Sequence, residues 1–142
     1  MSNFRAFMKE NKKKKENVKY APTKSLVDEN GKPLEWEFKH ITSQENLDLR
    51  DECTEEVQIT GKFGVYRDKT DSALYVKKLI TASVVYPNLD DSELQESYGV
   101  MGAEDLLMEM VDEPGEYADL AEFVQKMQGF KTLNEEADNA KN

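Results

Sequence analysis

The chain of 142 residues contains a single cysteine, Cys53, and therefore cannot form an internal disulfide. A lone thiol, in a chain long enough to bury a core without disulfides or a metal, agrees with a reducing cytoplasm. No apolar run approaches the roughly 20 residues that a membrane-spanning helix needs. The N-terminus carries basic charge but neither an apolar segment nor a cleavage site, so we expect no secretory signal.

Basic side chains are missing from the segment between Leu79 and Gln125, which contains twelve acidic residues. Residues 1–24 show the opposite composition, with eight Lys or Arg against two Glu and a charge of +6. Since the whole chain carries −10, residues 25–142 carry −16. Such an acidic surface repels phosphate backbones, which argues against nucleic acid as a partner of this part of the chain.

Motifs that support catalysis or metal binding are also missing. The chain has no phosphate-binding loop, no serine elbow, no dinucleotide fingerprint and no calcium-binding loop. His40 and Cys53 would form a nucleophilic pair only if the elements that carry them converged, and a lone buried cysteine is more often inert packing. We therefore expect no enzymatic activity, no cofactor and no metal.

The N-terminal half shows strand and turn signals. Asn30–Gly31 suits a tight turn, and Leu34, Trp36, Phe38 and His40 then alternate onto one face, so residues 24–42 predict a β-hairpin. Thr42 and Glu45 form a capping box that predicts a helix over residues 43–54. Residues 55–68 combine β-branched side chains with two glycines, which fits either a second hairpin or an ordered loop.

Helix signals dominate the second half. Residues 70–85 predict a central buried helix that Pro87 ends. Its apolar stripe consists of Ala73, Val76, Ile80 and Ser83, with Leu79 and Val84 beside it. The pairs Asp90/Glu93 and Leu89/Leu94 predict a capping box and a hydrophobic staple for a short helix that Gly99 ends.

Two further helices are expected after Gly102. The first presents Leu106, Leu107, Met110 and Val111 on its apolar side. Pro114 fits the first turn of the second, which Gly129 ends. Its apolar side consists of Tyr117, Leu120, Ala121, Val124 and Met127. The acidic pairs Asp90–Asp91 and Glu104–Asp105 stand near helix starts, where carboxylates cap free N–H groups.

These signals predict a mainly α protein of the α+β class. We expect a compact bundle of about four to five short helices with an N-terminal β-hairpin. Residues 1–16 form a basic arm with a short amphipathic helix, residues 17–130 a single globular domain, and residues 131–142 a polar tail that is expected to be disordered.

Two sets of apolar residues are candidates for partner binding. The first is the helical set Leu106, Leu107, Met110, Leu120 and Val124, which predicts grooves for apolar helices. Methionines support this only in part, since Met101, Met108, Met110 and Met127 fit either core packing or an adaptable binding surface.

The arm supplies the second set, Phe4, Phe7 and Met8, which recur at helical spacing. A helix of about ten residues is marginal in water, so this stripe should be ordered only when it docks on something. We predict that it packs on another copy of the chain while the lysines face acidic helices. A disordered, solvated tail is the alternative.

Four segments resemble one family in order and spacing over residues 16–130: "ENGKPLEWEFKHITSQE", "LRDECT", "YPNLDDSELQESYGVMGAEDLLMEM" and "PGEYADLAEFVQKMQGF". They are similar to the XkdN-like tail assembly chaperones, which are encoded beside the tail genes of phages and PBSX-like prophages of Gram-positive bacteria. The resemblance implies a non-enzymatic chaperone in the bacterial host cytoplasm that binds the tape measure protein and assists tail tube assembly. It also implies a longer frameshifted form as a partner, and absence from the mature virion.

Two other functions fit the composition. An acidic mimic of nucleic acid would inhibit a DNA-binding protein, but it needs carboxylates in a rigid array at phosphate-like spacing. Here the carboxylates cluster at predicted caps and alternate with apolar residues. A structural tail or connector subunit would remain in purified particles, where mass spectrometry would detect it.

Overall fold

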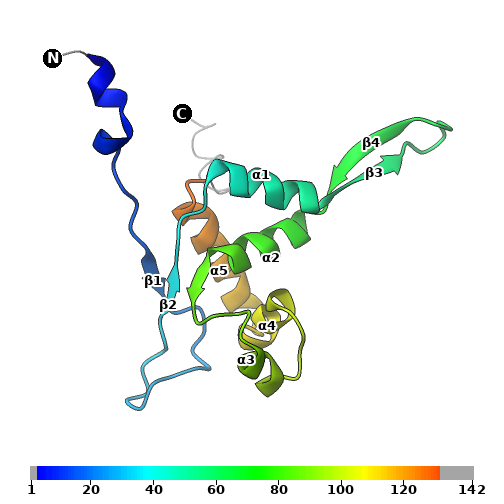
Figure 1. Cartoon of the computed structure of the whole chain (residues 1–142). Helices are drawn as coiled ribbons and strands as arrows, with labels where there is room; N and C mark the ends of the chain where they lie inside the picture. The colour runs from blue at the N-terminus through cyan, green and yellow to red at the C-terminus, as the bar shows by residue number, and fades with distance from the viewer. Residues whose placement is uncertain (1–2, 132–142) are drawn as a thin grey trace, which may run out of the picture.

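The computed structural model describes residues 3–131 (Figure 1). This part of the chain contains five α-helices, two short 3-10 helices and five strands in two sheets, an α+β fold. The elements are η1 (Asn3–Phe7), η2 (Lys9–Asn11), β1 (Val18–Tyr20), β2 (Trp36–Phe38), α1 (Ser43–Glu52), β3 (Thr54–Gln58), β4 (Tyr66–Thr70), α2 (Ser72–Ser83), β5 (Val84–Tyr86), α3 (Ser92–Ser97), α4 (Ala103–Met110) and α5 (Pro114–Met127). None of these helices is both long and apolar enough to cross a membrane.

A three-stranded antiparallel sheet of order β1-β2-β5 forms one side of the core. Tyr20 of β1 pairs with Trp36 of β2, and Phe38 pairs with Val84 of β5. Trp36 and Phe38 are buried because alternate residues of a strand point to the same face, here toward the helices. The helices therefore flank a small sheet, which corrects the expected helix bundle.

The N-terminal hairpin is confirmed only in part. The tight turn forms at Gly31, whose φ is 79°, but the bridge between Val27 and Pro33 remains isolated. The partner of β2 is instead β1, which precedes the predicted hairpin. Pro33 lacks the N–H that a ladder of backbone hydrogen bonds needs, so the strand does not extend back to it, and Leu34 lies exposed. At the other end β2 stops at Phe38, and His40 beyond it is half-buried.

Helix α2 lies at the centre of the fold, and its Leu79, Ile80 and Ser83 are buried (Figure 1). Ala73 of the predicted stripe is exposed. The helix ends at Ser83, two residues earlier than predicted, because Val84 begins β5. β-Branched residues pack well in strands, and the neighbouring edge of β2 supplies the hydrogen-bond partners.

Helices α3, α4 and α5 confirm the expected succession of short helices. The cap of α3 lies one residue later than predicted: the side chain of Asp91 accepts a hydrogen bond from the Leu94 N–H, while the Asp90 N–H donates to Asn88. Pro114 occupies the first turn of α5, as expected. The predicted capping box of α1 is present, with reciprocal bonds between Thr42 and Glu45.

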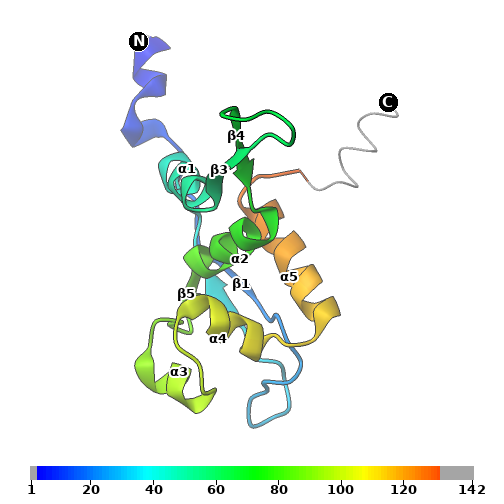
Figure 2. The ribbon, with the colours of Figure 1, turned by 90° about the vertical axis from the view of Figure 1, so that its right-hand side faces the viewer.

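Strands β3 and β4 form a hairpin, which settles the choice between hairpin and loop for residues 55–68. Their antiparallel register runs from Thr54 opposite Thr70 to Gln58 opposite Tyr66. Figures 1 and 2 show this hairpin projecting away from the other elements. Its far end therefore has no core to pack against.

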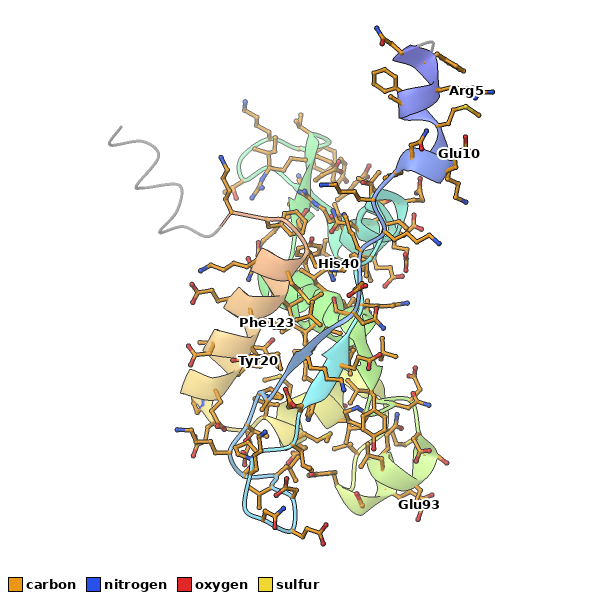
Figure 3. The ribbon with its side chains drawn as sticks, turned by 90° about the vertical axis from the view of Figure 1, so that its left-hand side faces the viewer. Arg5, Glu10, Tyr20, His40, Glu93 and Phe123 are labelled. Atoms are coloured by element: carbon orange, nitrogen blue, oxygen red, sulfur yellow. The ribbon has the colours of Figure 1, made fainter. Side chains whose placement is uncertain are left out.

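In the described part of the arm, residues 3–16, the helical turns are the 3-10 helices η1 and η2 and not the expected α-helix. Phe4, Phe7 and Met8 are exposed by 73%, 86% and 43%. The arm extends beyond β1 and away from the sheet (Figure 3). Its docking on another copy stays a prediction, and the expected disorder of the tail falls on residues 132–142, outside the described residues.

Candidate partner-binding surfaces

The five helical residues predicted to bind a partner all lie in the core. Leu106, Leu107, Leu120 and Val124 are fully buried and Met110 is 5% exposed. Helices α4 and α5 turn these side chains toward α2 and the sheet, so the predicted grooves are filled by the chain itself. In this structure the five side chains offer a partner no surface, and their role in binding stays a prediction that would require the core to open.

The end of the β3–β4 hairpin carries the most exposed aromatic side chain of the described residues. Phe63 is 97% exposed, and Val65 and Tyr66 follow it at 44% and 58%. Gly61 and Gly64 adopt positive φ on either side of Phe63, which lets the chain turn tightly. The sequence analysis did not predict this surface. The available signal was the pair Gly61 and Gly64 around Lys62 and Phe63, which indicates a tight turn that exposes the residues between the glycines.

A shallow hollow of about 480 Å³ lies between β5 and α3. Tyr86, Pro87 and Leu94 line it, and Tyr86 is 68% exposed.

Among the methionines, Met101 is 89% exposed and Met110 is buried. The core-packing interpretation therefore holds for Met110, whereas a binding role for the exposed Met101 stays a prediction.

A third candidate surface, which we name the arm groove, lies where the arm passes the start of α1 and the end of α5. It has a volume of about 700 Å³. Its lining residues are Lys12, Lys13, Lys15, Asn17, Lys39, His40, Ile41, Thr42, Ser43, Asn46, Leu47, Gln128, Gly129 and Phe130. Figure 3 shows His40 beside the segment that leads into the arm.

Gln128, just beyond α5, connects three elements at the base of the arm groove. Its Oε1 accepts a hydrogen bond from the Ile41 N–H at 3.0 Å. Its Nε2 donates to the Lys39 carbonyl at 2.9 Å and to the Ser83 hydroxyl at 2.8 Å. Ser83 is buried and donates in turn to the Leu79 carbonyl. One amide therefore holds the segment after β2 and the end of α2 to the end of α5.

Two contacts hold β1 and the loop after it to α5. Tyr20 stacks on Phe123 with ring centroids 4.2 Å apart (Figure 3). Glu116 accepts hydrogen bonds from the Thr23 hydroxyl at 2.7 Å and from the Lys24 N–H at 2.8 Å. These two bonds, with that from Thr23 foremost, lower the pKa of Glu116. This acidic residue is therefore occupied by a structural role.

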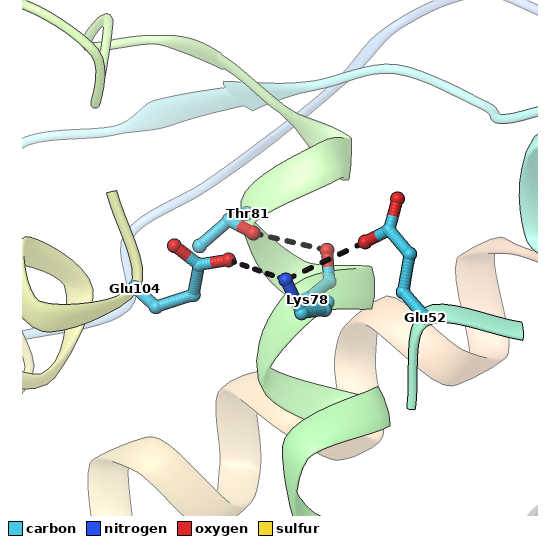
Figure 4. Close-up of polar contacts among 4 residues, drawn as sticks. All are labelled: Glu52, Lys78, Thr81 and Glu104. Atoms are coloured by element: carbon cyan, nitrogen blue, oxygen red, sulfur yellow. Dashed lines mark hydrogen bonds and ion pairs between the residues drawn. The ribbon is translucent and has the colours of Figure 1, made fainter. Parts of the chain in front are cut away.

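Lys78 of α2 lies between Glu52, at the end of α1, and Glu104, in the first turn of α4 (Figure 4). Its Nζ is 3.4 Å from Glu52 and 3.2 Å from Glu104. The hydrogen bond to Glu104 is the main cause that raises the pKa of Lys78. The three side chains are partly exposed, so each pair contributes at most about 1 kcal/mol. The arrangement ties three helices together.

His40 and Cys53 do not come together. They stand before and after α1, whose ten residues extend about 15 Å along the helix axis. Cys53 is buried at the end of α1, and burial raises the pKa of its thiol, which makes it a poor nucleophile. Residues 3–131 contain no group of three or more His, Cys, Asp or Glu placed to hold a metal ion.

The fold and these surfaces define a small α+β protein that exposes apolar side chains at the end of the β3–β4 hairpin and beside α3. The family model of the phage XkdN-like tail assembly chaperone protein matches residues 4–141. The chain therefore belongs to the XkdN-like tail assembly chaperone family, and the resemblance seen in its motifs is confirmed. Its role is in phage tail assembly.

Relatives in Bacillus subtilis strain 168 agree with this family. The chain is 27% identical to the phage-like element PBSX protein XkdN over 128 residues. This match covers 87% of this chain and 85% of that protein. It is also 27% identical to YqbN over 115 residues, and this match covers 81% of this chain and 76% of YqbN. The crystal structure of YqbN superposes with a TM-score of 0.74 at 23% identity, covering 92% of this chain and 99% of that one. At this identity the superposition shows the shared fold.

Proposed function

We propose that this protein binds the tape measure protein of its phage, keeps it soluble and assists the assembly of tail tube subunits around it. Membership of the tail assembly chaperone family is the observation that carries this proposal. A tape measure protein is long, helical and apolar, so it needs a partner that covers apolar surface before the tube encloses it. The chaperone acts in the bacterial host cytoplasm, together with a longer frameshifted form of itself, and leaves before the virion matures.

The β3–β4 hairpin is the element best placed to make the apolar contact. Phe63 lies at its far end, almost fully exposed, and Val65 and Tyr66 extend the apolar surface to the first residue of β4. An isolated two-stranded hairpin is marginally stable in water. Contact with an apolar helix would therefore stabilise the hairpin while it shields the tape measure protein.

Co-expression with the neighbouring tape measure protein tests the proposal. With the longer form also supplied, the intact chaperone should move the tape measure protein from the pellet to the supernatant. Phe63→Ser should leave most of it in the pellet, whereas Leu34→Ser, which replaces an exposed apolar side chain in the loop before β2, should not. An unchanged pellet with the intact, folded chaperone would refute the function. Equal solubility with Phe63→Ser would refute only the role of the hairpin.

A further inference from the structure

The arm groove differs in charge from the chain as a whole, which carries −10. Lys12, Lys13, Lys15 and Lys39 line the groove, and none of its lining residues is acidic. None of these four ammonium groups forms an ion pair with the described residues. Clustered cations in a concave surface produce a local positive potential. The groove therefore favours a negatively charged ligand.

The floor of the groove is apolar in part. Leu47 and Phe130 line it and are 54% and 39% exposed, and Ile41 lies half-buried beside them. A simple anion would leave this apolar surface in water. A ligand that carries both carboxylates and apolar side chains would cover it and gain from its burial. The volume of about 700 Å³ is in the range of sites that enclose a small ligand or a short stretch of chain.

A peptide fits this groove better than a nucleic acid does. Helix α1 supplies Leu47 to the groove but also carries Glu45, Asp48, Asp51 and Glu52 along its length. A nucleic acid presents phosphates at close, regular spacing and would meet these carboxylates on leaving the groove. A peptide presents charge only where its acidic side chains stand, so a short segment avoids the repulsion.

We propose that the arm groove binds an acidic, amphipathic segment of a partner protein. The carboxylates of that segment lie against the lysines of the arm and Lys39, and its apolar side chains pack on Ile41, Leu47 and Phe130. The groove adjoins the start of α1, whereas the β3–β4 hairpin follows its end. The site is therefore separate from the apolar contact proposed for the tape measure protein and does not depend on it.

Fluorescence anisotropy with the full chain tests the charge requirement. The probe is a labelled helical peptide of about fourteen residues with Glu and Leu along one side. We expect binding that weakens with added salt, because the screening length falls from about 10 Å at 0.1 M to about 3 Å at 1 M. The triple variant Lys12→Gln, Lys13→Gln, Lys15→Gln should bind about tenfold more weakly, since three exposed charge pairs contribute about twofold each.

A second variant tests the apolar requirement. Leu47→Gln should weaken binding about fivefold, because the peptide then no longer buries the exposed half of a Leu side chain. The matched control is Leu34→Gln, which replaces an exposed Leu outside the groove and should bind like the intact chain. A probe with Lys in place of Glu should not bind.

The control for the charge variant removes the same charge elsewhere. Lys32→Gln, Lys62→Gln, Lys69→Gln replaces three exposed lysines outside the groove and should leave the affinity within about twofold of the intact chain. Equal loss in both triple variants would overturn the proposal, since net charge would then be responsible. All these side chains are exposed, so unchanged melting temperatures will confirm that the variants fold.

Two other occupants of the groove would also overturn the proposal. If a single-stranded oligonucleotide binds in a lysine-dependent way and the acidic peptide does not, the groove recognises phosphate. If sedimentation of the chain alone shows a dimer that both the arm lysine variant and Leu47→Gln lose, the groove is filled by a second copy. Lysine-dependent and Leu47-dependent binding of the acidic peptide to the monomer is the result that supports the proposal.

Discussion

Replacement of Gln128 by Ala is expected to destabilise the protein far more than its position beyond the last helix suggests. The side chain makes three hydrogen bonds, to Ile41, Lys39 and Ser83. These partners lie 87, 89 and 45 positions before Gln128 in the sequence. A net hydrogen bond contributes about 1 kcal/mol, and a donor left unpaired costs about 1 to 3 kcal/mol when it is buried. Lys39 is exposed, so water can replace its bond, whereas the Ile41 N–H is half-buried. We therefore expect a total loss of about 2 to 3 kcal/mol.

Thermal unfolding followed by circular dichroism measures this loss. For a chain of this length, about 2 to 3 kcal/mol corresponds to a fall in melting temperature of about 10 °C. Gln125→Ala is the matched control, because that residue is also a half-buried Gln of the same segment but donates only to the Ala121 carbonyl within α5. It should change the melting temperature by no more than about 2 °C.

Hydrogen exchange adds a local measurement to the Gln128→Ala experiment. The Ile41 amide should lose protection in Gln128→Ala, because its acceptor Oε1 is gone, and keep it in Gln125→Ala. Equal shifts in melting temperature for the two variants, with Ile41 still protected in both, would refute the reasoning that Gln128 joins the three elements.

Two further predictions concern Glu116 and the arm. Because the pKa of Glu116 is lowered in the folded protein, its contribution is fully present above its unfolded pKa of about 4.3 and is lost as the pH falls through the folded value. Glu116→Gln should therefore melt at a lower temperature than the intact chain at pH 7, and in an acid titration the difference should shrink as the pH falls below the unfolded value of about 4.3. If the arm docks on a second copy, Phe4→Ala, Phe7→Ala should reduce the sedimenting mass at low salt. Identical masses for intact and variant chains in low and high salt would leave the arm without a role in self-association.

Local signals predicted the helices of this protein well. The capping box at Thr42, the first-turn position of Pro114 and the succession of short helices all depend on residues within about four positions of one another. Helix caps and first-turn residues can therefore be recognised from a short stretch of sequence. The shift of the α3 cap from Asp90 to Asp91 is small, because adjacent carboxylates both suit a helix start.

The sheet could not be predicted in the same way. Strands of three residues are too short for a period to be visible, and their pairing depends on partners far along the chain. Val84 could continue a helix or begin a strand, and the edge of β2 decided the choice. The prediction of partner-binding grooves on α4 and α5 depended on long-range packing in the same way. An apolar helix side shows that it is buried against something, and here it packs against the rest of the chain's own core.

The acidic stretch from Leu79 to Gln125 serves the fold to an extent that its composition does not reveal. Asp91 caps α3, Glu104 pairs with Lys78, and Glu116 holds the loop after β1. Carboxylates engaged in this way cannot also form a regular array on the surface, so they do not support mimicry of nucleic acid. The exposed Phe63 and the lysine-lined arm groove both lie outside this stretch. Recognition of partners is therefore expected mainly from the N-terminal half and the end of α5, while the acidic stretch provides most of the core, the cap of α3 and the net negative charge.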